Sequence, residues 1–138
     1  MRQLDQILNI RRDINSYDLR IIELRQSMAY PKAQTISDMP RGGERKNSIE
    51  EFIIKLERLN RKRANLECRL NSKWKDIKQL FVDRGVTEVQ SRVMELRFYH
   101  GLAWKRIVTE MEKLYPDTVW NEQKLFRIYR AVIGKIYK

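Results

Sequence analysis

Three short segments with a helical spacing of apolar residues follow one another in the last third of the chain, and they constrain its fold most strongly. The first runs from Thr87 to Tyr99. Its apolar face is formed by Val89, Val93, Leu96 and either Met94 or Phe98. Gly101 follows, and glycine takes the left-handed conformation past a helix end more readily than other residues. We therefore expect one helix to end before Gly101 and a second to begin after it.

The second and third segments complete a predicted three-helix unit, which we call the head (residues 86–138). Apolar spacing resumes from Leu102 to Leu114 and stops at Pro116, because proline lacks the amide donor and disfavours helical geometry in the preceding residue. The third helix is expected over residues 121–137, with Asn121 as its N-cap. Its apolar face consists of Leu125, Ile128, Val132 and Ile136.

The first part of the chain predicts a long antiparallel helical hairpin over residues 1–85. From Leu4 to Met28 apolar residues occupy the a and d positions of a heptad, namely Ile7, Ile10, Ile14, Tyr17, Ile21, Leu24 and Met28. Prolines and glycines predict a loop over residues 31–47, and Ser48 begins a capping-box pattern that predicts the start of the next helix. That helix continues the seam through Ile49, Phe52, Leu56, Leu59, Leu66, Leu70, Trp74, Ile77 and Leu80 or Phe81. Arg63 interrupts the seam, which predicts an exposed or paired side chain there.

Composition agrees with an all-α protein and favours a polyanionic partner. Of the 138 residues, 42% are hydrophobic and 34% are charged, and only three are proline, which is typical of a folded helical chain. The formal net charge of +11 favours nucleic acid as the partner. The alternative is that the charge serves solubility alone.

Several functional classes are disfavoured by the residues present. Cys68 is the single cysteine and His100 the single histidine, so neither a disulfide within the chain nor a Cys/His metal site is expected. The sequence has no phosphate-binding glycine loop and no recognisable catalytic arrangement. No apolar run approaches the roughly 20 residues of a membrane span. We therefore expect a protein of the reducing cytoplasm, without enzymatic activity, cofactor or metal.

The residues from Val93 to Val108 resemble the start of DNA-binding region 4 of sigma-70-type factors, where a helix ending in Leu-Arg-Tyr precedes Gly-Leu-Ser/Thr. Residues 121–136 resemble the recognition helix of that module. Residues 36–43 are similar to a loop in small phage proteins of Gram-positive bacteria, described as sigma-like or late-transcription regulators of the ArpU and RinA groups. Two departures stand out: Ala103 replaces the usual capping Ser or Thr, and the turn over residues 112–120 is several residues longer.

The resemblance implies a sequence-specific DNA-binding regulator of transcription in a bacterial host, acting on double-stranded DNA with host RNA polymerase as a further partner. A hairpin alone buries only a narrow seam, so we expect it to pack either on the head or on a second copy of itself. A homodimer is favoured, because two recognition helices one DNA turn apart read a two-part site. Exposed residues near the start of a recognition helix reach base edges, so Gln123, Lys124 and Arg127 are the expected base contacts. Phosphate contacts are expected from Lys105, Arg106 and Arg130. A second set of basic residues either adds phosphate contacts or forms a solvated flank of the hairpin: Arg58, Arg61, Lys62 and Arg69.

Aromatic residues of the head are expected to pack in its core rather than stack on bases, namely Phe98, Trp104, Phe126 and Tyr129. Trp120 is left open, since it could fill the head, dock a partner or touch DNA. Two rival functions remain beside DNA-binding regulation. One is a DNA-recognition subunit of phage packaging, similar to a small terminase, and the other is an inhibitor that binds a host protein.

Overall fold

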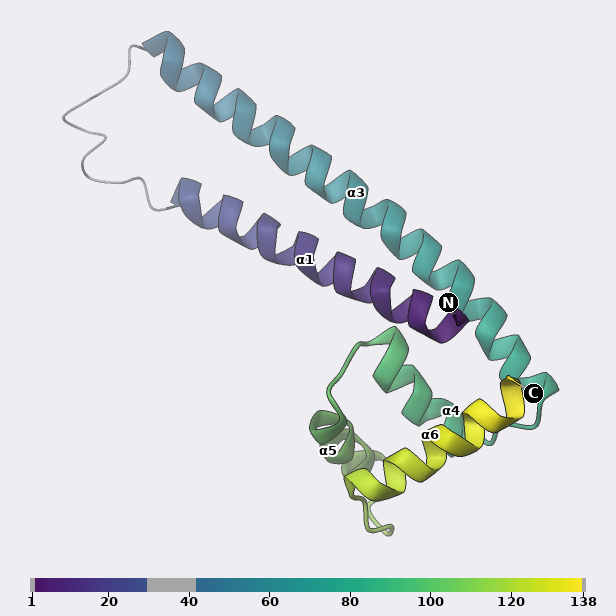
Figure 1. The fold of residues 1–138 in the computed structure, drawn as a ribbon. Coiled ribbons are helices and arrows are strands. Elements are labelled where there is room, and N and C mark those ends of the chain that lie inside the picture. Colours follow the sequence, from purple (N-terminus) through teal and green to yellow (C-terminus); the bar gives the residue numbers. More distant parts are fainter. Residues whose placement is uncertain (1, 30–41, 138) are drawn as a thin grey trace. The chain divides into compact units, whose positions relative to one another are not determined.

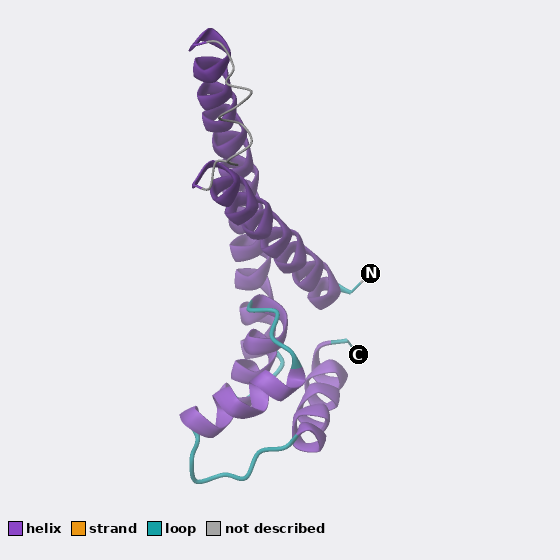
Figure 2. Cartoon of the chain, turned by 90° about the vertical axis from the view of Figure 1, so that its left-hand side faces the viewer, coloured by secondary structure: helices purple, strands orange, loops and turns teal. Residues whose placement is uncertain are grey.

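The computed structural model describes residues 2–29 and 42–137, and all regular secondary structure in these residues is helical (Figure 1). The helices are α1 (Gln3–Ala29), α3 (Gly42–Asp83), α4 (Glu88–Met94), the π-helical turn η1 (Glu95–Tyr99), α5 (Trp104–Leu114) and α6 (Glu122–Ile136). No strand occurs in the described residues (Figure 2), which confirms the all-α prediction.

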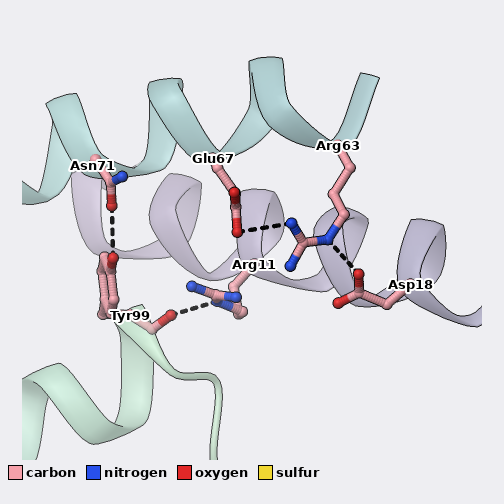
Figure 3. Close-up of polar contacts among 6 residues, drawn as sticks. All are labelled: Arg11, Asp18, Arg63, Glu67, Asn71 and Tyr99. Carbon is pink, nitrogen blue, oxygen red and sulfur yellow. Dashed lines mark hydrogen bonds and ion pairs between the residues drawn. The ribbon is translucent and has the colours of Figure 1, made fainter. Parts of the chain in front are cut away.

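The two long helices, α1 and α3, run antiparallel, as the heptad pattern predicts (Figure 1). Arg63 of α3 pairs with Asp18 of α1, and its guanidinium also lies 3.0 Å from Glu67 one turn further along α3 (Figure 3). The hydrogen bond with Asp18 is the main cause that raises the pKa of Arg63. Arg63 was expected to be either exposed or paired, and the structure shows that it is paired.

The predicted start of the second helix is wrong. We expected a loop over residues 31–47 and a helix from Ser48, but α3 begins at Gly42, so Ser48 lies inside the helix. The part of the predicted loop at residues 31–41 lies outside the described residues. Glu44, Arg45 and Lys46 are strong helix formers. A capping pattern is worth only about 1 kcal/mol, so it does not force a helix to start where helix-forming residues precede it.

The chain divides into two compact units that differ from the expected division after residue 85. Unit 1 comprises Met1–Arg12 together with Cys68–Lys138, and unit 2 comprises Asp13–Glu67. The start of α1 and the end of α3 belong with the head because their large apolar residues are buried within unit 1. These residues are Leu4, Ile7, Ile10, Leu70, Trp74, Ile77 and Phe81.

The core of the head is formed by residues from α4, α5, α6 and the turn before α6. Its buried cluster consists of Val93, Ile107, Met111, Trp120 and Leu125. Sequence periodicity left Met94 and Phe98 as alternatives, but both are buried, at 0% and 4% exposure. They form a second buried stripe because this segment is covered on two sides within unit 1, and periodicity alone cannot distinguish one covered face from two.

The helix starts of the head follow the capping rules where the sequence allows it. Thr87 and Gln90 form a complete capping box at the start of α4, and Asn121 accepts a hydrogen bond of 2.8 Å from the amide of Lys124. Ala103 supplies no side-chain bond at the start of α5, as its residue type predicts. The starts of α4 and α6 are thus fixed by side chains, whereas that of α5 depends on packing.

Candidate nucleic-acid interface

The basic charge of the protein is concentrated in the unit that contains the head. Unit 1 has 18 Lys and Arg residues against 9 Asp and Glu, a formal charge of +9. Unit 2 has 11 against 9, a formal charge of +2. Because a phosphate backbone attracts positive charge, an interface with nucleic acid is best sought on unit 1.

Helix α6 presents one polar and basic face opposite its buried face. Leu125, Val132 and Ile136 are buried and fix the inner side of the helix. Three exposed side chains at spacings of four and three residues form the outer side, and we call them the α6 stripe: Gln123, Arg127 and Arg130. No ion pair involves these three within the residues that the structure describes, so their polar groups point to solvent and are available to a ligand.

Lys124, the third expected base contact, lies in a different environment from the α6 stripe. Its side chain is half-buried, and its ammonium nitrogen lies 4.6 Å from the centre of the Trp120 ring. A cation held over an aromatic face at a partly exposed site gains about 0.5–1 kcal/mol. Lys124 would have to give up this contact to reach a base, so its role as a base contact stays a prediction.

The expected phosphate contacts of α5 lie in its first turn. Lys105 and Arg106 are both exposed, and the Arg106 guanidinium lies 3.7 Å from Glu110. That ion pair joins two side chains on the surface and is worth little, so it does not prevent Arg106 from binding a phosphate. The first turn of α5 and the outer side of α6 therefore both carry available cations within unit 1.

Trp120 fills the head and fixes the long turn before α6. It is only 6% exposed, and its indole nitrogen donates a 3.2 Å hydrogen bond to the carbonyl oxygen of Tyr115. The two aromatic rings also pack at 6.2 Å between centres. Of the three roles left open for Trp120, the structure thus supports the core role. The buried Trp120 side chain thus anchors this turn, although residues 116–119 before it are exposed.

An aromatic cluster closes the side of the head near the start of α5. The Trp104 ring packs edge to face against Phe126 and Tyr129, at 5.2 and 5.9 Å between centres, and Phe98 stacks on Tyr129. The expected core position is confirmed for Phe98, which is buried, whereas Phe126 is 37% exposed and the prediction for it is wrong. Phe126 lies beside the α6 stripe in sequence, on the lining of an open groove of about 260 Å³.

Arg97 was not recognised from the sequence, and it supports this aromatic cluster. Its guanidinium lies 4.9 Å from the centre of the Trp104 ring and donates a 3.0 Å hydrogen bond to the carbonyl oxygen of Leu102. Burial is the main cause that lowers its pKa, followed by the nearby charge of Arg12. No spacing rule identifies this residue, because its partner is a backbone carbonyl that only the turn after η1 brings near.

A second contact missed from the sequence joins the head to both long helices within unit 1. The Arg11 side chain donates a 2.5 Å hydrogen bond to the carbonyl oxygen of Tyr99, and its guanidinium lies 5.3 Å from the Tyr99 ring centre (Figure 3). The Tyr99 hydroxyl donates to Asn71 at 2.6 Å. Gly101 allows the Arg11 side chain to pass, since a Cβ atom there would lie 2.8 Å from Arg11 Cγ.

The end of α6 is fixed by contacts that occupy its last cation. The Lys135 ammonium donates hydrogen bonds to the Gly85 carbonyl at 3.0 Å and to the Gln90 side chain at 3.1 Å. The Tyr137 hydroxyl accepts a bond from the Leu4 amide, and burial raises the pKa of this hydroxyl. These contacts hold the inner side of α6 against the rest of unit 1, which leaves the α6 stripe facing outward.

The basic residues of the hairpin are divided between the two units. Arg58, Arg61 and Lys62 belong to unit 2, and Arg69 belongs to unit 1. All four side chains are exposed. This exposure agrees equally with additional phosphate contacts and with a solvated flank, so both alternatives stay open.

Two further observations bear on other kinds of site. Within residues 2–29 and 42–137, no group of three or more His, Cys, Asp or Glu side chains is placed to hold a metal ion. None of the helices described there is both long and apolar enough to cross a membrane. Cys68 and His100 are exposed.

No family model matches the chain, and neither the curated proteins nor the solved structures contain a significant match to it.

Proposed function

We propose that the protein is a sequence-specific DNA-binding regulator of transcription, of the phage type, which inserts α6 into the major groove. The observation that carries this proposal is the α6 stripe, an exposed polar and basic face opposite the buried face of the last helix. It belongs to the unit with a formal charge of +9. The resemblance of the head to region 4 of sigma-70-type factors supports the same function.

The proposed mechanism follows from the dimensions of DNA and the chemistry of the stripe. The major groove is about 12 Å wide, which admits one α-helix. Arg127 would donate to O6 and N7 of a guanine, and Gln123 would pair with an adenine. Lys124 is a further base contact if it leaves the Trp120 ring. Lys105, Arg106 and Arg130 would bind phosphates, which sets the position of the helix without reading sequence.

The partners belong to the same proposal. The protein would act in the cytoplasm of a bacterial host as a homodimer, because two recognition helices separated by one DNA turn bind a two-part site. Host RNA polymerase would be its protein partner in transcription. We propose no catalytic activity and no cofactor.

Selection of fragments from the genome that encodes the protein tests this function. We expect the protein to retain one or a few fragments in the presence of excess competitor DNA. Three phosphate-binding cations per protomer give six in a dimer, so the logarithm of the association constant should fall with the logarithm of salt concentration with a slope of about −5. Equal retention of all fragments at every salt concentration would remove sequence-specific binding from the proposal.

A second candidate function is DNA recognition in phage packaging. It is favoured by the exposed apolar residues of unit 2, which suit assembly of several copies. A ring-sized assembly in solution, measured by mass, would support this candidate over a dimeric regulator.

A further inference from the structure

The outer side of α6 carries one large apolar side chain among its polar ones. Phe126 lies three residues after Gln123 and four residues before Arg130, and side chains at these spacings are neighbours on one face of a helix. Among residues 122–136, all of which the structure describes, Phe126 is the only large apolar residue that is exposed, at 37%. The face that would enter the major groove therefore has an apolar component as well as polar ones.

The position of the Phe126 ring is fixed by its neighbours within unit 1. The ring packs edge to face against Trp104, with 5.2 Å between the ring centres and 79° between the ring planes. Trp104 is in turn covered by the Arg97 guanidinium at 4.9 Å, and Arg97 is held by its hydrogen bond to the Leu102 carbonyl oxygen. A ring that is fixed in this way loses little conformational entropy when a ligand covers its exposed part.

The chemistry of the major groove indicates which group the exposed part of this ring would meet. Base edges present hydrogen-bond donors and acceptors there, and their one apolar group is the C5 methyl group of thymine. Phenylalanine is one of the side chains that contact this methyl group in protein–DNA complexes. Phe126 lies next to Arg127 in the chain and on the same side as Gln123, the two expected base contacts that belong to the α6 stripe. A helix that brings these two side chains to base edges would bring the ring there as well.

We propose that Phe126 contacts the C5 methyl group of a thymine, and that it thereby specifies one base pair that the α6 stripe does not read by hydrogen bonds. Cytosine at the same position lacks the methyl group and presents an amino donor instead, which a phenyl ring leaves unpaired. The contact therefore favours thymine over cytosine. This inference rests on the proposed function, since it requires α6 to lie in the major groove.

Replacement of thymine by deoxyuridine tests this contact, because it removes the methyl group and keeps every hydrogen-bonding atom of the base. The full-length protein is titrated against a retained genomic fragment and against copies in which each thymine is replaced in turn. Wild-type affinity should fall about fourfold at one position of each half-site, as expected for the burial of one methyl group. Phe126→Ala should bind the substituted and unsubstituted copies equally. Leu114→Ala is the matched control, since Leu114 is a 50% exposed apolar residue of α5, and this variant should keep the fourfold difference.

The outcomes separate this inference from the proposed function. If no fragment is retained at all, the proposed function fails and the thymine contact falls with it. If a fragment is retained but no deoxyuridine weakens wild-type binding, only the thymine contact is overturned, and this result does not require that Phe126→Ala folds. A position that stays sensitive in Phe126→Ala would also overturn it, because another side chain would then contact the methyl group.

Discussion

Trp120→Ala is expected to lower the free energy of unfolding by about 4 kcal/mol. The change removes a side chain that is 6% exposed and belongs to the buried cluster with Val93, Ile107 and Leu125. It also leaves the Tyr115 carbonyl without its indole donor and the Lys124 ammonium without its ring. Chemical denaturation followed by far-ultraviolet circular dichroism measures the loss.

The neighbouring residue provides a matched control. Val119 is 82% exposed in the same turn, so Val119→Ala should change stability by less than about 0.5 kcal/mol. Trp120→Phe should lose less than Trp120→Ala because it keeps most of the apolar volume. If Trp120→Ala proved as stable as the wild type, the long turn would not be anchored by this side chain.

Gly101→Ala is expected to lower the free energy of unfolding by about 2 kcal/mol. The backbone of Gly101 has φ of 70°, a left-handed conformation that costs other residues about 1–2 kcal/mol. The new Cβ would also meet Arg11 Cγ at 2.8 Å and disturb the bond from Arg11 to Tyr99. Denaturant unfolding of the variant, compared with Arg11→Ala and with the double variant, measures both contributions. The double variant should lose less than the sum of the single losses, because the steric conflict needs both side chains.

Gly134 provides a matched control for the Gly101→Ala prediction. Gly134 lies inside α6 without a positive φ, and a Cβ there would have no neighbour within 4 Å. Gly134→Ala should therefore raise stability by about 0.5–1 kcal/mol, since alanine has the higher helix propensity. Equal effects of the two substitutions would contradict the role assigned to Gly101.

The helices of the head could be predicted from sequence because their signals are local. Gly101, Pro116 and Asn121 mark the helix ends, and the apolar spacing between them identifies the buried faces. The start of α3 could not be predicted in the same way, since weak capping and helix-forming signals overlap at residues 42–48. Capping and helix-forming preferences of similar strength therefore cannot determine the residue at which a helix begins.

The spacing of apolar residues could not predict contacts between segments that are far apart in the sequence. The hydrogen bond from Arg11 to the Tyr99 carbonyl joins residues 88 positions apart. The residue types alone do not indicate that these two would be partners. The division into two units could not be predicted for a similar reason. The heptad pattern of apolar residues is the same along the whole of α1 and α3, but these residues are buried mainly in unit 1. Heptad spacing predicts that a seam exists and not how completely it is covered.

The candidate interface was predictable in part. Helical spacing places Gln123, Arg127 and Arg130 opposite the buried face of α6, and all three are exposed. The same spacing does not reveal that Lys124 packs over Trp120, because that contact depends on how the long turn folds back.

The most direct test measures base discrimination at a retained DNA fragment. Affinities of the wild type, Arg127→Ala and Lys105→Ala are compared over a set of sites in which each base pair is changed in turn. Arg127→Ala should lose about 1–3 kcal/mol of discrimination at one position of each half-site, whereas Lys105→Ala should weaken binding to all sites by a similar factor. An unchanged discrimination profile for Arg127→Ala would contradict sequence reading by α6.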